Sequence, residues 1–431
     1  MRYYRTEAAM LTEAENEALV RVGPGTAMGE LMRRYWMPAL LSRELSEPDC
    51  PPVRVRLLGE RLVAFRDTAG RAGLLSEFCA HRGASLWFGR NEEGGLRCVF
   101  HGWKYDVDGN CLDMMNEPDA FDFKQKVHLR AYPTVEAGGL VWAFMGPPER
   151  KPPPPAFEWT QAPETHRYVD KTWEECNWLQ GLEGGLDTSH VPILHRRFEE
   201  GSPQPGVDAS APLVRGRAPK VVVETTGYGY RYFGVRELES DEVYVRGYHF
   251  VMPFTQIRPG ADFTGGDLVA GHMWAPMDDH NTMVYNWEYS LTDAMEDPQA
   301  VARELGSGPG EVDDRFRKAR NQDNDYRIDR ALQKTGTFTG IFGVNTQDHA
   351  IQESMGPIAD RTVEQLGQAD RAIITARKLL LDAAQAVADG GEALGASASV
   401  DGLRAADRVL ARASDWHAAM LAEMHADGAR A

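Results

Sequence analysis

The spacing of hydrophobic residues changes along the chain and predicts regions of different structure. Over residues 11–45 the run GELMRRYWMPALL has apolar side chains at helical spacing until Pro38 interrupts it. From Pro52 onward, short alternating runs such as VRVRLLG and RLVAFRD are separated by Gly, Asp and Asn, which is typical of antiparallel strands. We therefore expect a helical lead-in over residues 1–50 and a small antiparallel β domain over residues 51–155.

A second domain is predicted beyond Lys151, because the four prolines that follow it can form neither a helix nor a central strand. Residues 173–195 read as mostly helix, and the runs VVVETTGYGYRYFGVRE, EVYVRGYHFVMPF and TMVYNWEYSL read as strands. From Asp348 onward the pattern is helical, which predicts a C-terminal helical tail. The fold class is therefore α+β, with a larger sheet-and-helix domain over residues 156–431.

Composition and charge narrow the function classes. The 431 residues are 42% hydrophobic and 26% charged, as in soluble globular proteins, and the formal net charge is −17. Such an acidic surface repels nucleic acid and anionic lipid, so neither is an expected partner. No apolar run approaches the length of a membrane span, and five cysteines are an odd, sparse set. We expect a cytoplasmic protein with reduced cysteines.

Two Cys/His pairs in the predicted β domain are candidate ligands of a metal centre. Cys79-x-His81 is followed, after sixteen residues, by Cys98-x-x-His101. Thiolate suits ferric iron and sulfide, while imidazole can change its protonation as the metal changes oxidation state. Mixed ligation therefore indicates a 2Fe-2S cluster with both cysteines on one iron and both histidines on the other. The alternative is structural zinc, although zinc fingers normally pair Cys with Cys and His with His.

The motifs CAHRG and CVFHGWKYD resemble the Rieske 2Fe-2S signature of the terminal oxygenase component of Rieske non-haem iron oxygenases. The resemblance extends from MLTEAENEALVRVGPGTAMGELMRRYWMPALL to QDHAIQESMGPIADRTVEQLGQADRAI and is to the phthalate dioxygenase-like branch. It implies a small antiparallel-β Rieske domain followed by a catalytic domain of the helix-grip, START-like type. It also implies hydroxylation of an aromatic substrate, bearing a carboxylate, with O2 and two electrons.

The resemblance further implies a mononuclear Fe(II) site in the second domain. The segment NWLQGLEGGLDTSHVPILH offers His190 and His195, and one carboxylate would complete a set that leaves an open face for O2 and substrate. In the family this carboxylate is an aspartate from a late helix, and the QD step at Asp348 resembles its context. We therefore select Asp348, with two alternatives nearby, His349 and Glu353.

Asp187 lies three residues before His190 and has an implied role of its own. The resemblance implies an electron relay in which its carboxylate binds a ligand histidine and reaches a Rieske histidine, His101, of a neighbouring subunit. That arrangement requires a head-to-tail homotrimer, or a hexamer of stacked trimers. The alternative role for Asp187 is that of an ordinary residue at a helix end.

An aromatic carboxylate calls for a guanidinium partner. Arg246 is the first candidate, because it shares a strand face with Tyr244 and Tyr248. The other candidates are Arg215 and Arg217. The alternative is that Arg246 forms a salt bridge on the surface.

The chain shows no G-x-G-x-x-G fingerprint after a strand, so NAD(P)H and flavin are expected on a separate reductase. The predicted iron sites do not separate ring hydroxylation from aryl-ether O-demethylation, because both reactions use two electrons and O2 at one centre. Two other classes remain possible from the residues. One is a zinc hydrolase using His190, His195 and Asp348, and the other is a Rieske electron carrier, which the long second domain disfavours.

Overall fold

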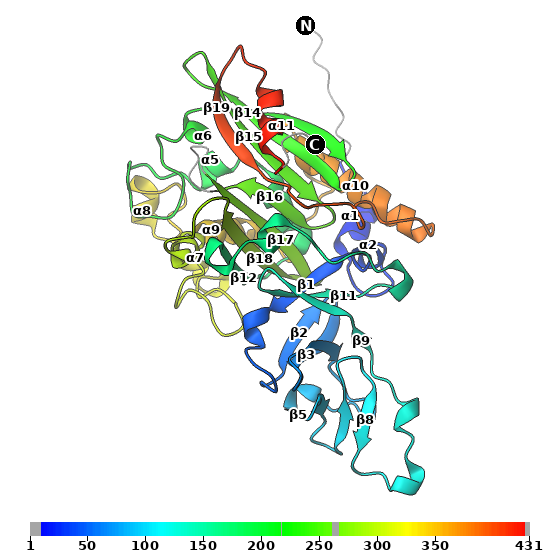
Figure 1. Cartoon of the computed structure of the whole chain (residues 1–431). Coiled ribbons are helices and arrows are strands. Elements are labelled where there is room, and N and C mark those ends of the chain that lie inside the picture. The colour runs from blue at the N-terminus through cyan, green and yellow to red at the C-terminus, as the bar shows by residue number, and fades with distance from the viewer. Residues whose placement is uncertain (1–9, 217, 261–266, 427–431) are drawn as a thin grey trace.

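The computed structural model describes residues 10–216, 218–260 and 267–426, and these form two lobes. Figure 1 shows a smaller lobe of short strands below and a larger lobe, built around one extended sheet, above. Every strand pairing in the sheets is antiparallel. The α+β fold class predicted from the sequence is confirmed.

The chain begins with two helices that pack on the larger lobe. Helix α1 (Glu13–Val20) starts at Thr12, whose Oγ1 accepts from the backbone N–H of Glu15 at 3.2 Å, while the Glu15 carboxylate accepts from Thr12 N at 2.8 Å. This reciprocal capping box satisfies backbone donors that the first turn leaves free. Helix α2 (Ala27–Met32) follows.

The helical lead-in predicted up to residue 45 is wrong beyond α2. Residues Trp36–Leu41 form strand β1, which pairs with β11 (Leu140–Phe144), and β10 (Thr134–Ala137) completes a three-stranded sheet. All six residues of β1 are buried, and the register shifts between Pro38 and Leu40. A short apolar run buried on both faces has no alternation, so its spacing does not distinguish strand from helix.

The smaller lobe contains two four-stranded sheets. The strands of the first are β2 (Val53–Leu57), β3 (Glu60–Arg66), β4 (Ala72–Ser76) and β9 (Ala131–Tyr132). Those of the second are β5 (Arg90–Glu92), β6 (Gly95–Arg97), β7 (Trp103–Tyr105) and β8 (Cys111–Met114). The loop from β4 to β5 and the turn from β6 to β7 contain the two Cys/His pairs.

The larger lobe is an eight-stranded sheet. Its order is β12 (Arg167–Glu174), β18 (Asn281–Ser290), β17 (Leu268–Asp278), β16 (Thr255–Pro259), β15 (Glu242–Val251), β14 (Gly229–Glu237) and β13 (Lys220–Thr226), with β19 (Ala406–Ala411) paired to β15. Helices α4 (Trp178–Leu186) and α10 (Arg371–Ala388) pack on the sheet, and their buried leucines and alanines share one core with its tyrosines and tryptophans.

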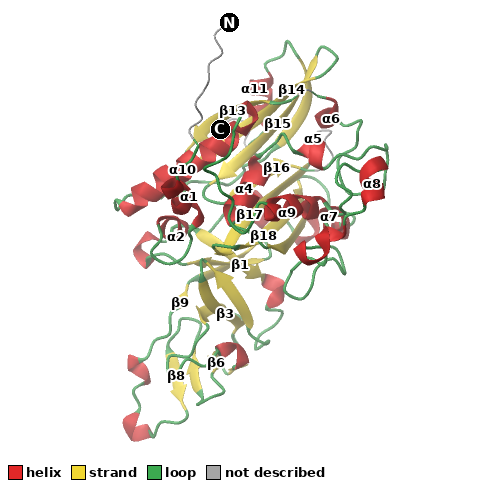
Figure 2. Cartoon of the chain, turned by 180° about the vertical axis from the view of Figure 1, so that it is seen from behind, coloured by secondary structure: helices red, strands yellow, loops and turns green. Residues whose placement is uncertain are grey.

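The remaining helices are arranged around this sheet. They are α3 (Glu158–Gln161), α5 (Val191–Leu194), α6 (Pro212–Arg215), α7 (Pro298–Leu305), α8 (Arg330–Thr335), α9 (Val344–Ser354) and α11 (Trp416–Glu423). Figure 2 shows α1, α2 and α10 on one flank of the larger lobe, with α7 and α9 beside β17 and β18. Different helices therefore cover the two flanks. On one, α10 packs against the lead-in helices, and on the other, α9 faces the predicted iron site.

The C-terminal region is not helical throughout, contrary to the prediction. Strand β19 lies between α10 and α11, and its register places Asp407 opposite Arg246 of β15. The two side chains form a buried ion pair, with Arg246 Nη1 3.3 Å from Asp407 Oδ2. The run ADRVLA was expected to be helical, but pairing with β15 makes it a strand, because tertiary contacts override local helix propensity.

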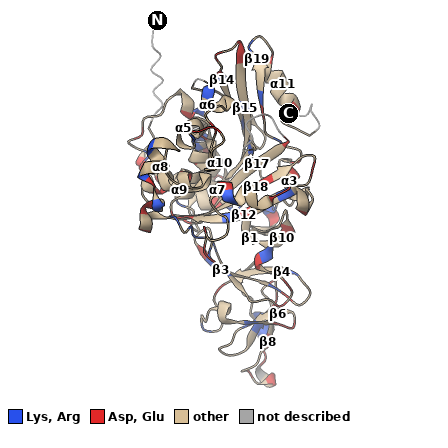
Figure 3. Ribbon diagram, turned by 90° about the vertical axis from the view of Figure 1, so that its left-hand side faces the viewer, with Lys and Arg blue, Asp and Glu red and all other residues tan. Residues whose placement is uncertain are grey.

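Acidic and basic residues occur in both lobes (Figure 3). Across the described ranges, no helix combines the length and the apolar character needed to cross a membrane. The predicted domain boundaries near residues 50 and 155 stay predictions. Strand β1, from the lead-in, pairs with β11, which ends at Phe144 shortly before the four prolines of residues 152–155, so the lead-in is joined to the end of the predicted β domain.

Candidate metal centres and active-site pocket

The two Cys/His pairs come together at the end of the smaller lobe. Cys79 and Cys98 are both buried, and the rings of His81 and His101 have centroids 4.5 Å apart. Tight loops make this approach possible. Gly83 and Gly102, just beyond the histidines, have φ angles of 72° and 78°, a region that favours glycine.

The chemistry of these four donors fits an iron-sulfur cluster. His81 Nδ1 is buried and has no hydrogen-bond partner among the described residues, which is costly unless a metal or other group takes its lone pair. Burial, together with the nearby Cys79, raises the pKa of the Cys98 thiol, and a coordinating metal removes that proton. Two thiols and two imidazoles therefore lie in one region, with one imidazole nitrogen, His81 Nδ1, left for a ligand to satisfy.

Tyr105 is a further residue of this centre, which the sequence analysis did not single out. Its side chain is fully buried on β7, and its hydroxyl lies 3.3 Å from Cys79 Sγ. Burial raises the pKa of Tyr105 well above its ordinary value, so the hydroxyl keeps its proton and can donate to a thiolate. The signal was present in the motif CVFHGWKYD, where Tyr105 is seven residues after Cys98.

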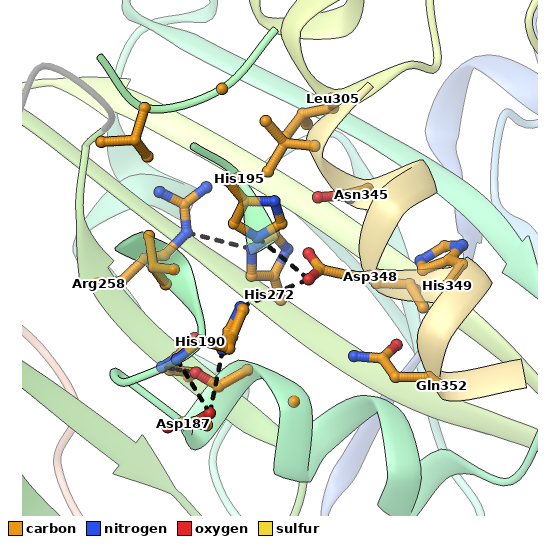
Figure 4. Close-up of a pocket in the computed structure, with 18 of the residues that line it drawn as sticks. Asp187, His190, His195, Arg258, His272, Leu305, Asn345, Asp348, His349 and Gln352 are labelled. Carbon is orange, nitrogen blue, oxygen red and sulfur yellow. Dashed lines mark hydrogen bonds and ion pairs between the residues drawn. The ribbon is translucent and has the colours of Figure 1, made fainter. Parts of the chain in front are cut away.

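In the larger lobe the structure brings His190, His195 and Asp348 together (Figure 4). The two histidines flank the single turn of α5, and Asp348 projects from α9. Asp348 Oδ1 lies 3.4 Å from His190 Nε2 and 3.1 Å from His195 Nε2, and one ligand atom from each residue lies within 4.8 Å of the others. Pro192 stands in the first turn of α5, where its missing N–H is tolerated.

The electrostatics of this triad favour a cation. Burial alone would raise the pKa of Asp348, but the two imidazoles lower it well below its usual range. Burial alone would lower the pKa of His190, but Asp187 and Asp348 raise it to about 10. The carboxylates therefore stabilise positive charge at this point, which a divalent metal can supply in place of protons. Two imidazoles and one carboxylate are the facial donor set of non-haem Fe(II).

The two alternative ligands on α9 face other partners. His349 Nδ1 contacts Lys318 Nζ, which also donates to Glu353 Oε1 at 3.2 Å. The Tyr326 hydroxyl donates to Glu353 Oε2. Both side chains are therefore engaged in a buried network, while Asp348 points at the histidines.

Each histidine of the triad has a different hydrogen-bond partner behind it. His195 Nδ1 lies 2.8 Å from Gln347 Oε1, so this nitrogen holds the proton and Nε2 is free to face a metal. His190 Nδ1 lies 3.4 Å from Asp187 Oδ2. Gln347 precedes Asp348 in the QD step, but its role was not anticipated from the sequence.

Asp187 is a residue at a helix end, and its relay role stays a prediction. It ends α4, and its Oδ1 accepts from Ser189 N at 2.6 Å while its Oδ2 accepts from His190 N at 3.1 Å. The same Oδ2 faces the His190 ring. The local turn thus aims this carboxylate at the ligand histidine.

A pocket lies beside the triad and contains two arginines. Arg246, predicted from the sequence, lines it but is already paired with Asp407 and donates to Pro259 O at 2.9 Å. Arg215 is exposed at the end of α6 and does not line the pocket, so the structure does not support its predicted role. Arg217 lies outside the described residues.

Arg258 is the pocket arginine that the sequence analysis missed. Its Nε donates to His272 Nε2 and its Nη1 to Pro259 O, both at 3.1 Å. Burial lowers its pKa, yet a guanidinium stays charged in proteins. It forms no direct ion pair with a carboxylate of the described residues, although the charges of Glu288 and Asp348 raise its pKa in opposition to burial. Arg258 lies in the strand sequence TQIRP, and the alternation of that strand did not distinguish a pocket residue from any other strand residue.

Comparison with known proteins identifies the family. A Rieske [2Fe-2S] domain model matches residues 35–133, and a model described as "LigXa C-terminal domain like" matches residues 143–431. The oxygenase subunit of phthalate 4,5-dioxygenase from Pseudomonas putida is 42% identical over 90% of this chain and 89% of its own length. The chain belongs to the Rieske non-haem iron oxygenases, as an oxygenase component of the phthalate dioxygenase-like branch.

Two further relatives widen the range of chemistry. The oxygenase subunit of 3-chlorobenzoate-3,4-dioxygenase from Comamonas testosteroni is 40% identical over 88% of this chain and 89% of its own. The oxygenase subunit of 5,5'-dehydrodivanillate O-demethylase from a Sphingobium species is 31% identical over 86% and 80%. Among solved structures, the terminal oxygenase of carbazole 1,9a-dioxygenase from Novosphingobium sp. KA1 has the same fold, with a TM-score of 0.57 at 19% identity over 85% and 94%.

Family membership settles the class of protein. It is an oxidoreductase of the Rieske oxygenase type, with a 2Fe-2S cluster and a mononuclear non-haem iron as cofactors. The zinc hydrolase and the isolated Rieske carrier considered from the sequence are excluded.

The first prediction concerns Tyr105→Phe. A hydrogen bond to a cluster thiolate stabilises the reduced, more negative state. Removing a bond worth about 1 kcal/mol should lower the one-electron potential by roughly 40 mV. An EPR-monitored redox titration measures this shift. A visible spectrum that matches that of the wild type checks that the cluster of the variant is intact. An unchanged potential would contradict the assignment.

The second prediction concerns Gln347→Leu. Without its acceptor, the His195 ring loses the bond that fixes its tautomer, and Fe(II) affinity should fall about 10- to 100-fold. Metal titration of the cluster-loaded protein measures the affinity. Gln347→Glu keeps an acceptor and should restore binding, while Gln385→Leu on the exposed face of α10 should change nothing. Equal affinities in all three variants would remove Gln347 from the site.

Proposed function

We propose that this chain hydroxylates an aromatic carboxylate with O2 and electrons from a separate NAD(P)H-dependent flavin reductase. The single observation that carries the substrate class is Arg258, a half-buried guanidinium that lines the pocket beside the triad and forms no direct ion pair with a carboxylate of the described residues. Glu288 and Asp348 act on it through electrostatics without contacting it, so a bound anion would give this cation its direct partner. A substrate carboxylate supplies that anion, and the named substrates of two relatives are benzoate-type or phthalate acids.

The pocket residues have distinct proposed roles. Arg258 holds the carboxylate through the guanidinium edge that faces away from His272, and Arg246 adds positive charge from β15. The ring lies between apolar walls that orient it, formed by Trp274, Val284 and Leu305. The carbon held over the iron face then decides the regiochemistry.

We assign the cofactor ligands as follows. Cys79, His81, Cys98 and His101 hold the Rieske cluster, and His190, His195 and Asp348 hold the mononuclear iron. When bound, the cluster supplies electrons one at a time and the iron activates O2. Around them, Gln347 and Asp187 fix the orientation of the two imidazoles. Asp187 also relays electrons, because it touches His190 and is partly exposed.

The electron route requires a second copy of the chain. Figure 1 places β5 and β8, near the cluster loops, at the opposite end of the molecule from α5 of the iron site. Exposed Val99 and Phe100 next to His101 offer an apolar contact surface at that end. We infer a head-to-tail trimer, or a hexamer of two trimers, in which Asp187 meets His101 of the partner subunit.

The reductase and the location complete the proposal. A ferredoxin binds the oxygenase in a solved complex of carbazole 1,9a-dioxygenase, a structural neighbour at 19% identity. For this chain we propose that a separate reductase is the electron donor, within the cytoplasm.

Aryl-ether O-demethylation is the second candidate. It is favoured by the relative named an O-demethylase oxygenase subunit. A methoxylated aromatic carboxylate would use the same arginine, with the methyl carbon held at the iron in place of a ring carbon. The product separates the two reactions, because demethylation releases formaldehyde.

The third prediction tests the substrate class. The oxygenase, with a surrogate reductase, is screened against phthalate isomers, chlorobenzoates and methoxybenzoates by substrate-dependent O2 consumption and formaldehyde release. We expect O2 consumption coupled to product formation with the free carboxylates and not with their uncharged amides or esters. Arg258→Met should raise KM about 10- to 100-fold, since a hydrogen bond to a charged group is worth roughly 1.5–3 kcal/mol.

Arg215→Met is the matched control, because that arginine is exposed on α6 away from the pocket. Its kinetics should equal those of the wild type. Turnover of the uncharged amide or ester at the same KM as the acid, or an unaltered KM in Arg258→Met, would refute the carboxylate anchor.

The fourth prediction concerns the relay. Asp187→Asn should retain both metal centres, because neither Oδ atom is assigned to a metal, but the neutral amide accepts the His190 proton less strongly. We expect single-turnover electron transfer to the iron to slow by on the order of 100-fold. Stopped-flow absorbance of the prereduced cluster follows the transfer. Wild-type rates with a full iron content would exclude Asp187 as the relay.

A further inference from the structure

Four polar side chains form a continuous hydrogen-bonded line from the pocket arginine to the helix of the iron carboxylate. Arg258 Nε lies 3.1 Å from His272 Nε2, and His272 Nδ1 lies 2.8 Å from Asn286 Oδ1. Asn345 Nδ2 donates to the same oxygen at 2.8 Å. Figure 4 shows Arg258, His272 and Asn345 around the triad.

The direction of each hydrogen bond in this line is determined by chemistry. A guanidinium has only donors, so His272 Nε2 must accept and the ring proton must lie on Nδ1. That proton is donated to Asn286 Oδ1. Burial and the charge of Arg258 lower the pKa of His272 to about 3, which keeps the ring neutral. Only one assignment of donors and acceptors therefore makes all the hydrogen bonds of this line. Displacing the side chain at either end breaks one of these bonds.

The middle of the line lies within the sheet. His272 and Asn286 are directly opposite each other in the register of β17 and β18. His272 is half-buried and lines the pocket, whereas Asn286 is 1% exposed, and its Nδ2 is buried without a hydrogen-bond partner among the described residues. Solvent therefore has little access to the Asn286 end of the line. In such surroundings a hydrogen bond is strong, and its loss is costly.

The far end of the line lies on α9. Asn345 is three residues before Asp348, so the two side chains lie on neighbouring positions of one helix face. Asn345 and Asp348 both line the pocket. The helix that offers the carboxylate ligand is therefore tied, through two strands, to the arginine that faces the substrate.

We propose that this line couples anion binding at Arg258 to the order of α9 and hence to the placement of Asp348. The inference rests on the proposed function, because it requires a substrate carboxylate at Arg258. His272 and Asn286 are then positioning residues: neither touches substrate carboxylate or metal, and both act through their neighbours. A carboxylate that binds the guanidinium edge facing away from His272 holds Arg258 in this arrangement, which fixes the line and stabilises the first turns of α9.

The competing explanation is a purely structural brace between β16, β17, β18 and α9. A brace would affect stability in every state of the protein, but it would not make α9 respond to a ligand. The two explanations therefore differ in the change that a carboxylate causes, rather than in the properties of the ligand-free protein.

The test uses full-length, cluster-loaded protein without mononuclear iron, with phthalate as the probe. Calorimetry measures phthalate binding, and hydrogen exchange with mass spectrometry follows the peptide of residues 344–354. In the wild type, saturating phthalate should slow exchange in α9 about fivefold. Asn286→Leu should still bind phthalate through Arg258 but lose this protection, because the acceptor oxygen is gone.

Two variants complete the design. Asn286→Asp keeps the acceptor oxygen and should retain the response, whereas Asn345→Ala cuts the line at the helix and should abolish it, without replacing a residue of the sheet. If Asn286→Leu does not fold, the comparison of Asn345→Ala with the wild type decides. The peptide of α10, residues 371–388, should be insensitive to phthalate in every variant.

The outcomes separate this inference from the proposed function. If phthalate binds the wild type and α9 exchange is unchanged, or is slowed equally in Asn286→Leu and Asn345→Ala, the coupling is refuted and the carboxylate anchor stands. If no aromatic carboxylate binds the wild type, both the anchor and the coupling are refuted.

Discussion

The convergence of largely enclosed carboxylates and imidazoles in the larger lobe is the constraint on which the rest of the structure depends. Asp348 lies within 3.4 Å of both His190 and His195, although more than a hundred and fifty residues separate His195 from Asp348. Burying such charges is costly unless they are compensated. The protein therefore needs elements that hold α4, α5 and α9 in place, and a cation between them.

Two buried ion-pair systems supply that support. Glu183 of α4 binds Arg361 at 2.9 Å and Arg377 of α10 at 2.6 Å, which fixes the helix that ends at Asp187. Glu353 of α9 binds Lys318 at 3.2 Å, which fixes the helix of Asp348. Removing one member of such a pair leaves a buried charge alone. The support is thus specific for the two segments that approach the metal.

The sequence predicted what is local and missed what depends on tertiary pairing. The Cys/His pairs were identified because their spacing is short and their chemistry is unusual, and the antiparallel α+β fold followed from alternating runs. Strands β1 and β19 were mistaken for helix because apolar and alanine-rich runs suit both structures. Asp348 was selected through family resemblance, since spacing alone cannot connect residues so far apart.

The arginines show the same limit. Arg246 lines the pocket, although its substrate-binding role stays a prediction, and its partner Asp407 comes from β19, which was not predicted. Arg258 looked like any other residue of an alternating strand, while Arg215, named as an alternative, is exposed. Whether a strand residue faces a cavity or solvent depends on register, and register is set by distant neighbours.

The two histidines of the triad differ in exposure and in the residue that lies behind each of them. Side chains of His190 and Asp187 are 23% and 19% exposed, whereas that of His195 is 4% exposed and is backed by a buried Gln347. Burial lowers the pKa of His190, but Asp187 and Asp348 raise it, whereas His195 has the neutral amide of Gln347 behind it. Asp187 and Arg258 line the same pocket, so this pocket presents a carboxylate behind one ligand histidine and a guanidinium elsewhere in its wall. The two histidines therefore lie in different electrostatic surroundings although both face one carboxylate, Asp348.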